Sequence, residues 1–269
     1  NLLSMMPSII LLAVMMFLLG IGLGGMDVAS NTLMAWTHKE NSSPYLNAMF
    51  VFAGMGGFLT PLLLGRLSLN WGFSLIGVLL ILPALWLLST PSPAIPNSRK
   101  TESNGKHGMR LSFILFTIIA FLYVGYENAY GGWIFTYYMK YQLGGESTAY
   151  LITSAFWLAL TFGRLLAIPI TARVRTPSVI WGSILGAILS GILLVCLPQN
   201  ATAIWIGTLG LGISTAAIFP TTFSYVQTKI HISGRRSGLV WAAGSLGAMS
   251  LPWGVGLLIE SRGPLSLMI

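Results

Sequence analysis

Three charged side chains occur inside long apolar stretches of the chain, the carboxylates of Asp27 and Glu127 and the guanidinium of Arg164. A charged group near the middle of a bilayer costs about 2.5–3.5 kcal/mol on insertion scales, so it is normally functional or paired. A carboxyl group in this setting can exchange a proton or help to hold a sodium ion. The alternative is a structural ion pair of either carboxylate with Arg164. Both interpretations stay open at this point.

Aromatic rings accompany Glu127 along its predicted helix. Spacings of three or four residues place the rings on one face, with an acid and an amide adjoining it: Tyr126, Glu127, Asn128, Tyr130, Trp133 and Tyr137. Flat rings beside amide and carboxyl groups suit a sugar, which offers C–H faces for stacking and hydroxyls for hydrogen bonds. The alternative is an aromatic belt at the outer membrane interface, which explains Tyr137, Tyr138 and Tyr141 but leaves Tyr126 and Tyr130 too deep.

Four apolar stretches carry their small and polar residues on one helical face. These stripes are Gly20, Gly24, Asp27 and Asn31; Asn47, Phe50, Gly54, Gly57 and Pro61; Tyr150, Ser154, Trp157, Thr161 and Arg164; and Gly207, Gly210, Ser214, Thr221 and Tyr225. Lipid offers polar groups no hydrogen bonds, so the stripes should face the bundle interior or a watery cavity. The glycines are equally explained by close helix packing. The predicted binding or coupling residues are Asp27, Asn31, Asn47, Glu127, Asn128, Tyr130, Trp133, Trp157 and Arg164.

The elements that position these residues are membrane helices. Hydrophobic residues make up 55% of the chain and charged residues 7%, whereas an ordinary soluble domain carries about 25% charged residues. Apolar stretches long enough for a spanning helix, about 20 residues, lie at 7–35, 46–66, 71–89, 111–138, 149–171, 178–197, 201–226 and 238–259. A closed barrel would show period-2 alternation, which is absent. The sequence predicts an all-α polytopic membrane protein.

A polar segment rich in Pro, Ser, Asn and Lys divides the chain. We predict a linker over residues 91–110, because its prolines cannot continue a helix. Residues 1–90 would then be the last three helices of an N-terminal half. Residues 111–269 would be five helices and the start of a sixth. The chain looks like a fragment cut at both ends.

The chain also repeats itself. Residues 18–67 align with residues 208–257 at a constant offset of 190 and without a gap, and most of the identities are glycines or a loop lysine. Each copy is an apolar stretch, a short basic turn and a second apolar stretch. Secondary transporters are commonly built from such repeats around a shared site. We therefore expect the copies to be related by rotation about an axis along the membrane normal.

The basic charge follows the predicted topology. If the first span runs from outside to inside, ten basic residues lie in cytoplasmic loops: Lys39, Arg99, Lys100, Lys106, Arg110, Arg173, Arg175, Lys229, Arg235 and Arg236. Three lie outside: Arg66, Lys140 and Arg262. This bias obeys the positive-inside rule and places the 91–110 linker in the cytoplasm. The net charge of +8 is thereby explained by topology, and no nucleic acid partner is expected.

The sequence shows no cluster of residues that would form a metal site or an enzyme active site. Cys196 is a single cysteine within a span, which excludes disulfides and thiolate metal sites. The three histidines lie in predicted loops. A membrane-embedded enzyme such as a lipid-linked glycosyltransferase would need catalytic acids in sizeable aqueous loops, and these loops are short. We expect no cofactor and no enzymatic activity.

Three motifs resemble a known family. They are Gly22-Leu-Gly-Gly-Met-Asp27-Val-Ala-Ser-Asn31, Tyr123-Val-Gly-Tyr-Glu127 with Gly131-Gly132-Trp133, and Phe162-Gly-Arg164. The chain resembles the fucose–proton symporter-like branch of the major facilitator superfamily, which includes sodium-dependent glucose transporter-like proteins. The resemblance implies twelve helices, alternating access and a central sugar site. It also implies that the chain runs from helix four to the start of helix twelve.

The resemblance assigns Asp27 to a position where the family carries an acid tied to substrate and proton. Two positions depart from the fucose symporters: Gly54 stands where they have an asparagine, and Glu127 where they have an amide. Both departures argue against fucose itself.

We predict a cation-coupled sugar transporter of the cell membrane, driven by H⁺ or Na⁺ and working as a monomer in the bilayer. The alternatives are a proton-driven drug antiporter of the same superfamily and a non-transporting sensor with the same fold.

Overall fold

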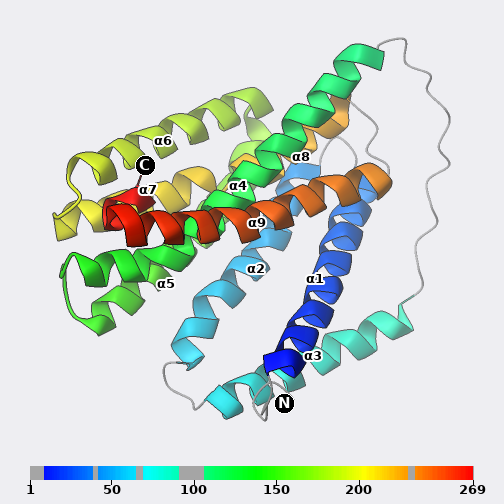
Figure 1. Ribbon diagram of the computed structural model, residues 1–269. Coiled ribbons are helices and arrows are strands. Elements are labelled where there is room, and N and C mark those ends of the chain that lie inside the picture. Colours follow the sequence, from blue (N-terminus) through cyan, green and yellow to red (C-terminus); the bar gives the residue numbers. More distant parts are fainter. Residues whose placement is uncertain (1–8, 39–41, 65–68, 91–105, 230–233, 269) are drawn as a thin grey trace.

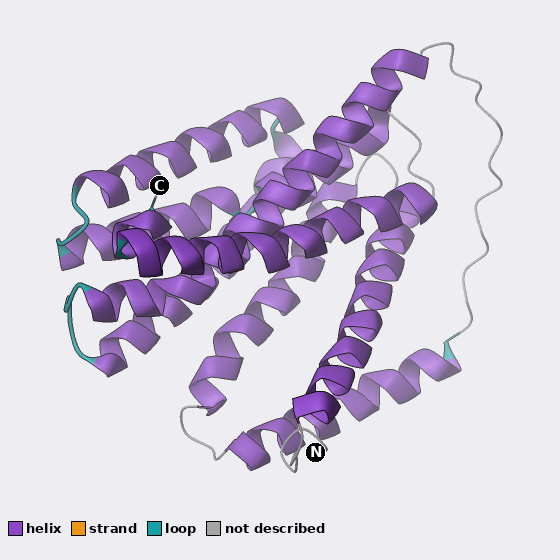
Figure 2. Ribbon diagram, viewed as in Figure 1, coloured by secondary structure: helices purple, strands orange, loops and turns teal. Residues whose placement is uncertain are grey.

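The computed structural model describes residues 9–38, 42–64, 69–90, 106–229 and 234–268, and that part of the chain is built from helices and short turns (Figures 1 and 2). The helices are α1 (Ile9–His38), α2 (Ser42–Leu64), α3 (Leu69–Ser89), α4 (Lys106–Lys140), α5 (Glu146–Arg173), α6 (Thr176–Cys196), α7 (Ala201–Thr215), α8 (Ile218–Lys229), α9 (Gly234–Arg262) and the 3₁₀ helix η3 (Pro264–Leu267). The predicted all-α fold is confirmed. Within the described residues, six helical stretches are long and apolar enough to cross a membrane, and one of them, Ala201–Val226, consists of α7 and most of α8.

The helices follow the eight predicted spans, with two differences. The predicted span 201–226 is interrupted at residues 216–217, where α7 ends and α8 begins. Pro220 lacks the N–H that would bond to the carbonyl of Ala216, so a continuous helix would lose a hydrogen bond here. The second difference is the start of α4 at Lys106, which makes the last five residues of the predicted linker helical. Residues 91–105 of that linker lie outside the described residues.

The helices before and after the linker are packed together. The most extensive packing joins α4 to α9 and α2 to α5, and α7 packs between α5 and α6. In Figure 1 α2 runs alongside α5, although the two are far apart in the sequence. The antiparallel register places Phe50 beside Arg164 and Gly54 beside Thr161. Since α2 precedes the linker and α5 follows it, this pair ties the two parts of the chain together.

Two further contacts cross between these parts, near the C-terminal end of α1 and the N-terminal end of α2. There α1 packs against α9, and α2 packs against α8. The Thr32 hydroxyl donates to Ser237 Oγ at 2.9 Å, and the Ser42 hydroxyl donates to Ser224 Oγ at 3.1 Å, both buried. On the repeat alignment α1 corresponds to α7–α8 and α2 to α9, so the two packings are reciprocal. This reciprocity fits the predicted rotation that relates the two copies, which remains a prediction.

Two buried clusters form the core. One joins α4, α5 and α7 around Tyr130, Phe156 and Leu160. It also contains Tyr137, which is fully buried and donates its hydroxyl to the Pro198 carbonyl at 2.7 Å. The aromatic-belt interpretation is therefore wrong for Tyr137, because its position near the helix end is covered by the α6–α7 turn. The second cluster is mainly aromatic and joins α2, α4, α8 and α9: Leu46, Phe116, Tyr123, Phe219, Phe223 and Val240.

Glycines allow the closest contacts between helices. Close packing was one explanation of the glycines in the predicted stripes, and it holds for some of them. A Cβ atom at Gly54 would collide with the Thr161 hydroxyl, and one at Gly207 would lie 2.6 Å from Leu194 side-chain atoms. By contrast, no atom lies within 4 Å of the Cβ position of Gly20 or Gly24. Close packing therefore explains Gly54 and Gly207 but not Gly20 or Gly24.

The α4–α9 contact gives a stability prediction. A Cβ atom at Gly247 would collide with the Phe121 carbonyl oxygen and lie 2.8 Å from its carbonyl carbon, whereas Gly254, on the same helix, has nothing within 4 Å. Because helix backbone cannot move aside as a side chain can, Gly247→Ala should destabilise the fold by about 1–3 kcal/mol. We expect a lower melting temperature of the detergent-solubilised protein. Gly254→Ala is the control and should lower the melting temperature less. An equal decrease for both substitutions would show that the close backbone approach at Gly247 does not cause the destabilisation.

Candidate functional site

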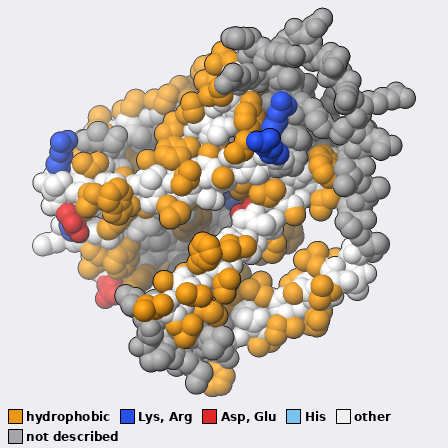
Figure 3. Space-filling model, turned by 45° about the vertical axis from the view of Figure 1, so that its right-hand side comes forward, with side chains coloured by type: hydrophobic (Ala, Val, Ile, Leu, Met, Phe, Trp, Pro, Cys, Tyr) orange, Lys and Arg blue, Asp and Glu red, His pale blue; other side chains and the backbone are white. Residues whose placement is uncertain are grey.

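A cavity of about 210 Å³ lies where helices from both sides of the linker meet. Six helices contribute its lining: Asp27 from α1; Phe50, Ala53 and Gly54 from α2; Tyr123, Val124, Glu127 and Asn128 from α4; Trp157 and Arg164 from α5; Phe219 from α8; and Trp241 from α9. Figure 3 shows this face of the molecule hollowed, with acidic atoms in the depth of the hollow between apolar surfaces. A cavity with charged walls in an otherwise apolar bundle is suited to a polar solute.

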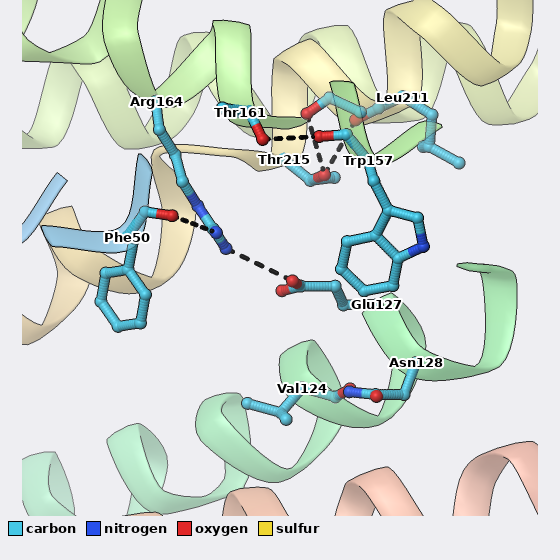
Figure 4. A network of polar contacts seen from close by, with 10 residues as sticks. Phe50, Val124, Glu127, Asn128, Trp157, Thr161, Arg164, Leu211 and Thr215 are labelled. Atoms are coloured by element: carbon cyan, nitrogen blue, oxygen red, sulfur yellow. Dashed lines mark hydrogen bonds and ion pairs between the residues drawn. The ribbon is translucent and has the colours of Figure 1, made fainter. Parts of the chain in front are cut away.

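Arg164 occupies the centre of the polar lining. Its Nη2 lies 3.3 Å from Glu127 Oε1, and its Nη1 donates to the Phe50 carbonyl at 3.1 Å (Figure 4). The guanidinium also lies over the Phe50 ring, with 5.0 Å from Cζ to the ring centroid. The side chains are 6% exposed for Arg164 and 13% for Glu127. The planar, multi-donor guanidinium can make these contacts at once, which a lysine ammonium cannot reproduce.

The local sequence explains how Arg164 reaches α2. Trp157, Thr161 and Arg164 lie on one face of α5, and the Thr161 hydroxyl is tied back to the Trp157 carbonyl at 2.8 Å. Gly54 lies opposite Thr161 and has no side chain to hold α2 away. The Phe50 carbonyl, one turn earlier on α2, therefore comes within hydrogen-bond distance of Arg164. A helical carbonyl has a second lone pair for such a bond.

The two carboxylates differ in their surroundings. Glu127 is mostly buried and paired with Arg164. Asp27 is exposed on α1 and lines the same cavity. Within the described part of the chain, no basic side chain forms an ion pair with Asp27. The sequence left open which acid pairs with Arg164, and the structure assigns that pairing to Glu127.

Amide and aromatic groups complete the site. Asn128 lines the cavity, and its Nδ2 donates to the Val124 carbonyl at 2.8 Å, which leaves the amide oxygen free of that bond. Trp157 projects above Glu127 in Figure 4. Its ring packs against Gly131, where an added Cβ would lie 2.8 Å from Trp157 Cζ2. The small residue at Gly131 thus fixes the ring at the cavity wall.

Four predicted site residues do not line this cavity, because each is engaged in packing. The amides of Asn31 and Asn47 donate to the carbonyls of Asp27 and Ser43, both at 2.9 Å. The Tyr130 hydroxyl bonds to Thr208 Oγ1 at 2.7 Å, and Trp133 Nε1 donates to the Pro252 carbonyl at 2.8 Å. These bonds join neighbouring turns or neighbouring helices.

Seven lining residues were not among the nine predicted site residues: Phe50, Ala53, Gly54, Tyr123, Val124, Phe219 and Trp241. Only Phe50 and Gly54 of these lie on a predicted polar stripe. Trp241 Nε1 is buried and has no hydrogen-bond partner among the described residues. A signal was present: Ser237, Trp241 and Gly244 share one helical face of the eighth span at steps of four and three. That face was not among the four predicted stripes. Phe219 carries no comparable signal, because an isolated aromatic residue in an apolar helix is ordinary.

Comparison with known proteins places this geometry in a family. Residues 1–252 match the family model described as Major Facilitator Superfamily. The chain belongs to the major facilitator superfamily. It is therefore a multi-pass membrane protein of a family of transporters and not of enzymes. The resemblance inferred from the three motifs is confirmed at this level.

The chain is similar to curated members of the superfamily. It is 28% identical over 288 residues to sodium-dependent glucose transporter 1 of Xenopus laevis, covering 93% of this chain and 58% of that protein. For sodium-dependent glucose transporter 1 of Homo sapiens the identity is 26%, with coverages of 93% and 56%. Major facilitator superfamily domain-containing protein 4A of Homo sapiens is 25% identical over 172 residues, with coverages of 64% and 34%. The chain thus spans about half the length of the glucose transporter relatives.

Proposed function

We propose that this chain is part of a secondary active transporter that moves a sugar or a similar small polar solute by alternating access, coupled to H⁺ or Na⁺. The observation that carries the proposal is the cavity between the two parts of the chain, where Asp27, the Glu127–Arg164 ion pair and several aromatic rings converge. Alternating access requires a site at such a junction, because relative movement of the two parts then opens it to either side. The similarity to proteins named sodium-dependent glucose transporters supports the same substrate class.

The size and lining of the cavity favour a compact polar solute. At roughly 30 Å³ per water molecule, 210 Å³ corresponds to about seven waters. Trp157 and Trp241 supply flat faces for stacking on C–H groups. Asp27, Asn128 and Trp241 Nε1 supply acceptors and donors for hydroxyl groups. Large hydrophobic drugs, the substrates of the antiporter alternative, would find little room among these charges.

The ion pair supplies a route for coupling. Arg164 is bonded both to Glu127 on α4 and to the Phe50 carbonyl on α2. A proton or a sodium ion on Glu127 would weaken its attraction for the guanidinium and so change the contact between the two parts of the chain. Different cation affinities in the two arrangements are what coupling requires. Asp27 serves in this proposal as the second acid, available to cation or substrate.

A sugar-uptake panel tests the proposal. The full-length protein in proteoliposomes should accumulate at least one labelled hexose or pentose when a sodium or proton gradient is applied, and accumulation should collapse when the gradient is removed. Competition by unlabelled sugars, but not by hydrophobic cations, is expected. Transport of hydrophobic cations without sugar competition would instead support the drug antiporter, and binding without transport would support the sensor.

We also propose that the linker and the basic loops lie on the cytoplasmic side of the cell membrane, and that the protein works as a monomer. Gly145, in the α4–α5 turn, and Val174, in the α5–α6 turn, are both exposed and lie at opposite ends of α5. In a Cys196→Ala background, Gly145→Cys should react with an impermeant thiol reagent in intact cells, whereas Val174→Cys should react only after permeabilisation. The reverse pattern would invert the proposed topology.

A further inference from the structure

A second cavity, of about 350 Å³, lies at the end of the bundle where α2 and α6 begin and α5 ends. Its lining is short and mostly polar: Ser43, Pro44, Tyr45, Thr171, Ala172, Thr176 and Ser224. It shares no lining residue with the cavity around Arg164. On the proposed topology it faces the cytoplasmic leaflet, because it adjoins the α5–α6 turn.

Two helix N-termini converge on this cavity. Ser43 and Pro44 are the second and third residues of α2, and Thr176 is the first residue of α6. The first N–H groups of a helix lack intrahelical acceptors, and the helix dipole adds positive potential there. In α6, Pro177 has no N–H and the N–H groups of Ser178 and Val179 donate to the Arg175 carbonyl, so its N-terminus offers the Thr176 N–H and the dipole. Helix N-termini therefore bind anions such as phosphate. Neither helix has an acid in its first turn, and none of the lining residues that the structure describes is acidic.

A buried hydroxyl points independently to a missing ligand. Ser43 is 6% exposed, and its Oγ is buried without a hydrogen-bond partner in the described structure. Buried polar atoms are normally hydrogen-bonded, so an unpaired hydroxyl in the wall of a polar cavity calls for a partner inside it. Ser224 lines the same cavity, and its Oγ already accepts the Ser42 hydroxyl at 3.1 Å. The Ser224 proton therefore remains available to an acceptor.

Positive side chains flank the cavity along the α5–α6 turn. Arg173 ends α5 and Arg175 is the N-cap residue of α6, so each is the chain neighbour of a lining residue, Ala172 or Thr176. Both arginines are exposed. Guanidinium groups at a membrane surface attract anionic lipid headgroups.

We infer that this cavity binds a phosphate group, supplied by an anionic phospholipid of the adjoining leaflet. The donors are the N-termini of α2 and α6 and the hydroxyls of Ser43 and Ser224, with Arg173 and Arg175 at the rim. Because α2 lies on one side of the linker and α5, α6 and α8 on the other, the bound headgroup bridges the two parts of the chain. The bound headgroup stabilises the conformation in which the helix ends around the cavity are in contact, because a ligand that binds one conformation favours that conformation.

Lipid binding to the purified full-length protein tests this inference without any transport assay. Delipidated protein in detergent is titrated with phosphatidylglycerol, with phosphatidylcholine and with inorganic phosphate, and bound lipid is counted by native mass spectrometry alongside the melting temperature. We expect phosphatidylglycerol to bind more tightly than phosphatidylcholine and to raise the melting temperature. Ser43→Asp places a carboxylate in the site and should weaken phosphatidylglycerol binding about tenfold, since a hydrogen bond to a charged group is replaced by repulsion.

Ser147→Asp is the matched control, because Ser147 is exposed in the first turn of α5, at the opposite end of that helix from the cavity, and does not line it. It should bind phosphatidylglycerol as the unmodified protein does. If the Ser43→Asp protein does not accumulate, Ser43→Ala replaces it in the test. This substitution only removes the hydroxyl, so we expect a smaller loss of phosphatidylglycerol binding. If inorganic phosphate alone raises the melting temperature and the Ser43 substitution abolishes this increase, the result would support an anion site that takes soluble phosphate. Equal lipid binding by the Ser43 and Ser147 variants, or no preference for phosphatidylglycerol, would overturn the inference.

Discussion

Glu127→Gln is expected to abolish cation-driven accumulation of substrate while the protein reaches the membrane at normal abundance. The glutamine retains an oxygen that can accept from Arg164 Nη2, which lies 3.3 Å from Oε1 in the structure. The substitution therefore keeps the contact between α4 and α5 and removes only the charge that a proton or sodium ion can neutralise. We expect accumulation in proteoliposomes to fall at least tenfold. Exchange of labelled for unlabelled substrate should persist, because exchange does not require release of the coupling ion.

The control is Glu146→Gln, which removes a carboxylate at the exposed start of α5, away from the cavity. It should leave accumulation unchanged. Normal accumulation by Glu127→Gln across pH and sodium concentration would contradict a coupling role. Loss of folded protein in Glu127→Gln would show instead that the charge of the pair is structural.

Arg164→Ala is expected to have the largest effect on stability, together with loss of transport. Removing one partner of a buried pair leaves the other charge uncompensated, which costs about 3–5 kcal/mol. The substitution also removes the bond to the Phe50 carbonyl and with it a contact between α5 and α2. We expect a clearly lower melting temperature in detergent and little folded protein in the membrane. Arg164→Lys should restore part of the stability, because an ammonium can reach only part of the guanidinium's contacts.

A double-mutant cycle separates the pair from the other contacts of Arg164. Adding Glu127→Gln to Arg164→Ala removes the uncompensated carboxylate and should recover part of the lost melting temperature. Arg262→Ala, at the exposed end of α9, is the control and should change little, since isolated surface charges contribute about 0–1 kcal/mol. Strictly additive effects of the two substitutions would mean that Glu127 and Arg164 do not interact energetically.

Five of the nine predicted site residues line the central cavity: Asp27, Glu127, Asn128, Trp157 and Arg164. All three charged members are among them, because the cost of a charge in lipid leaves few positions for it except a polar interior. Of the uncharged residues that were predicted, only Asn128 and Trp157 line the cavity. Asn47 and Tyr130 find hydrogen-bond partners within or between packed helices, so an interior face does not by itself imply a ligand.

The sequence alone determined the class of the protein, its membrane helices to within a few residues, and the helical faces on which the charged site residues lie. These properties follow from local composition and from the helical period, which any stretch of chain carries by itself. It did not determine the break at residues 216–217, although Pro220 marks that region.

Only the tertiary structure decided which inward faces meet. The pairing of Arg164 with Glu127 rather than Asp27, and the closure of the cavity by Phe219 and Trp241, depend on how α2, α4, α5, α8 and α9 pack. Helical spacing gives a side chain's direction around its own axis but not the helix that lies in that direction. That information resides in contacts between distant segments, such as Gly54 against Thr161, where the missing side chain sets how closely α2 approaches α5 and thereby what Arg164 can reach.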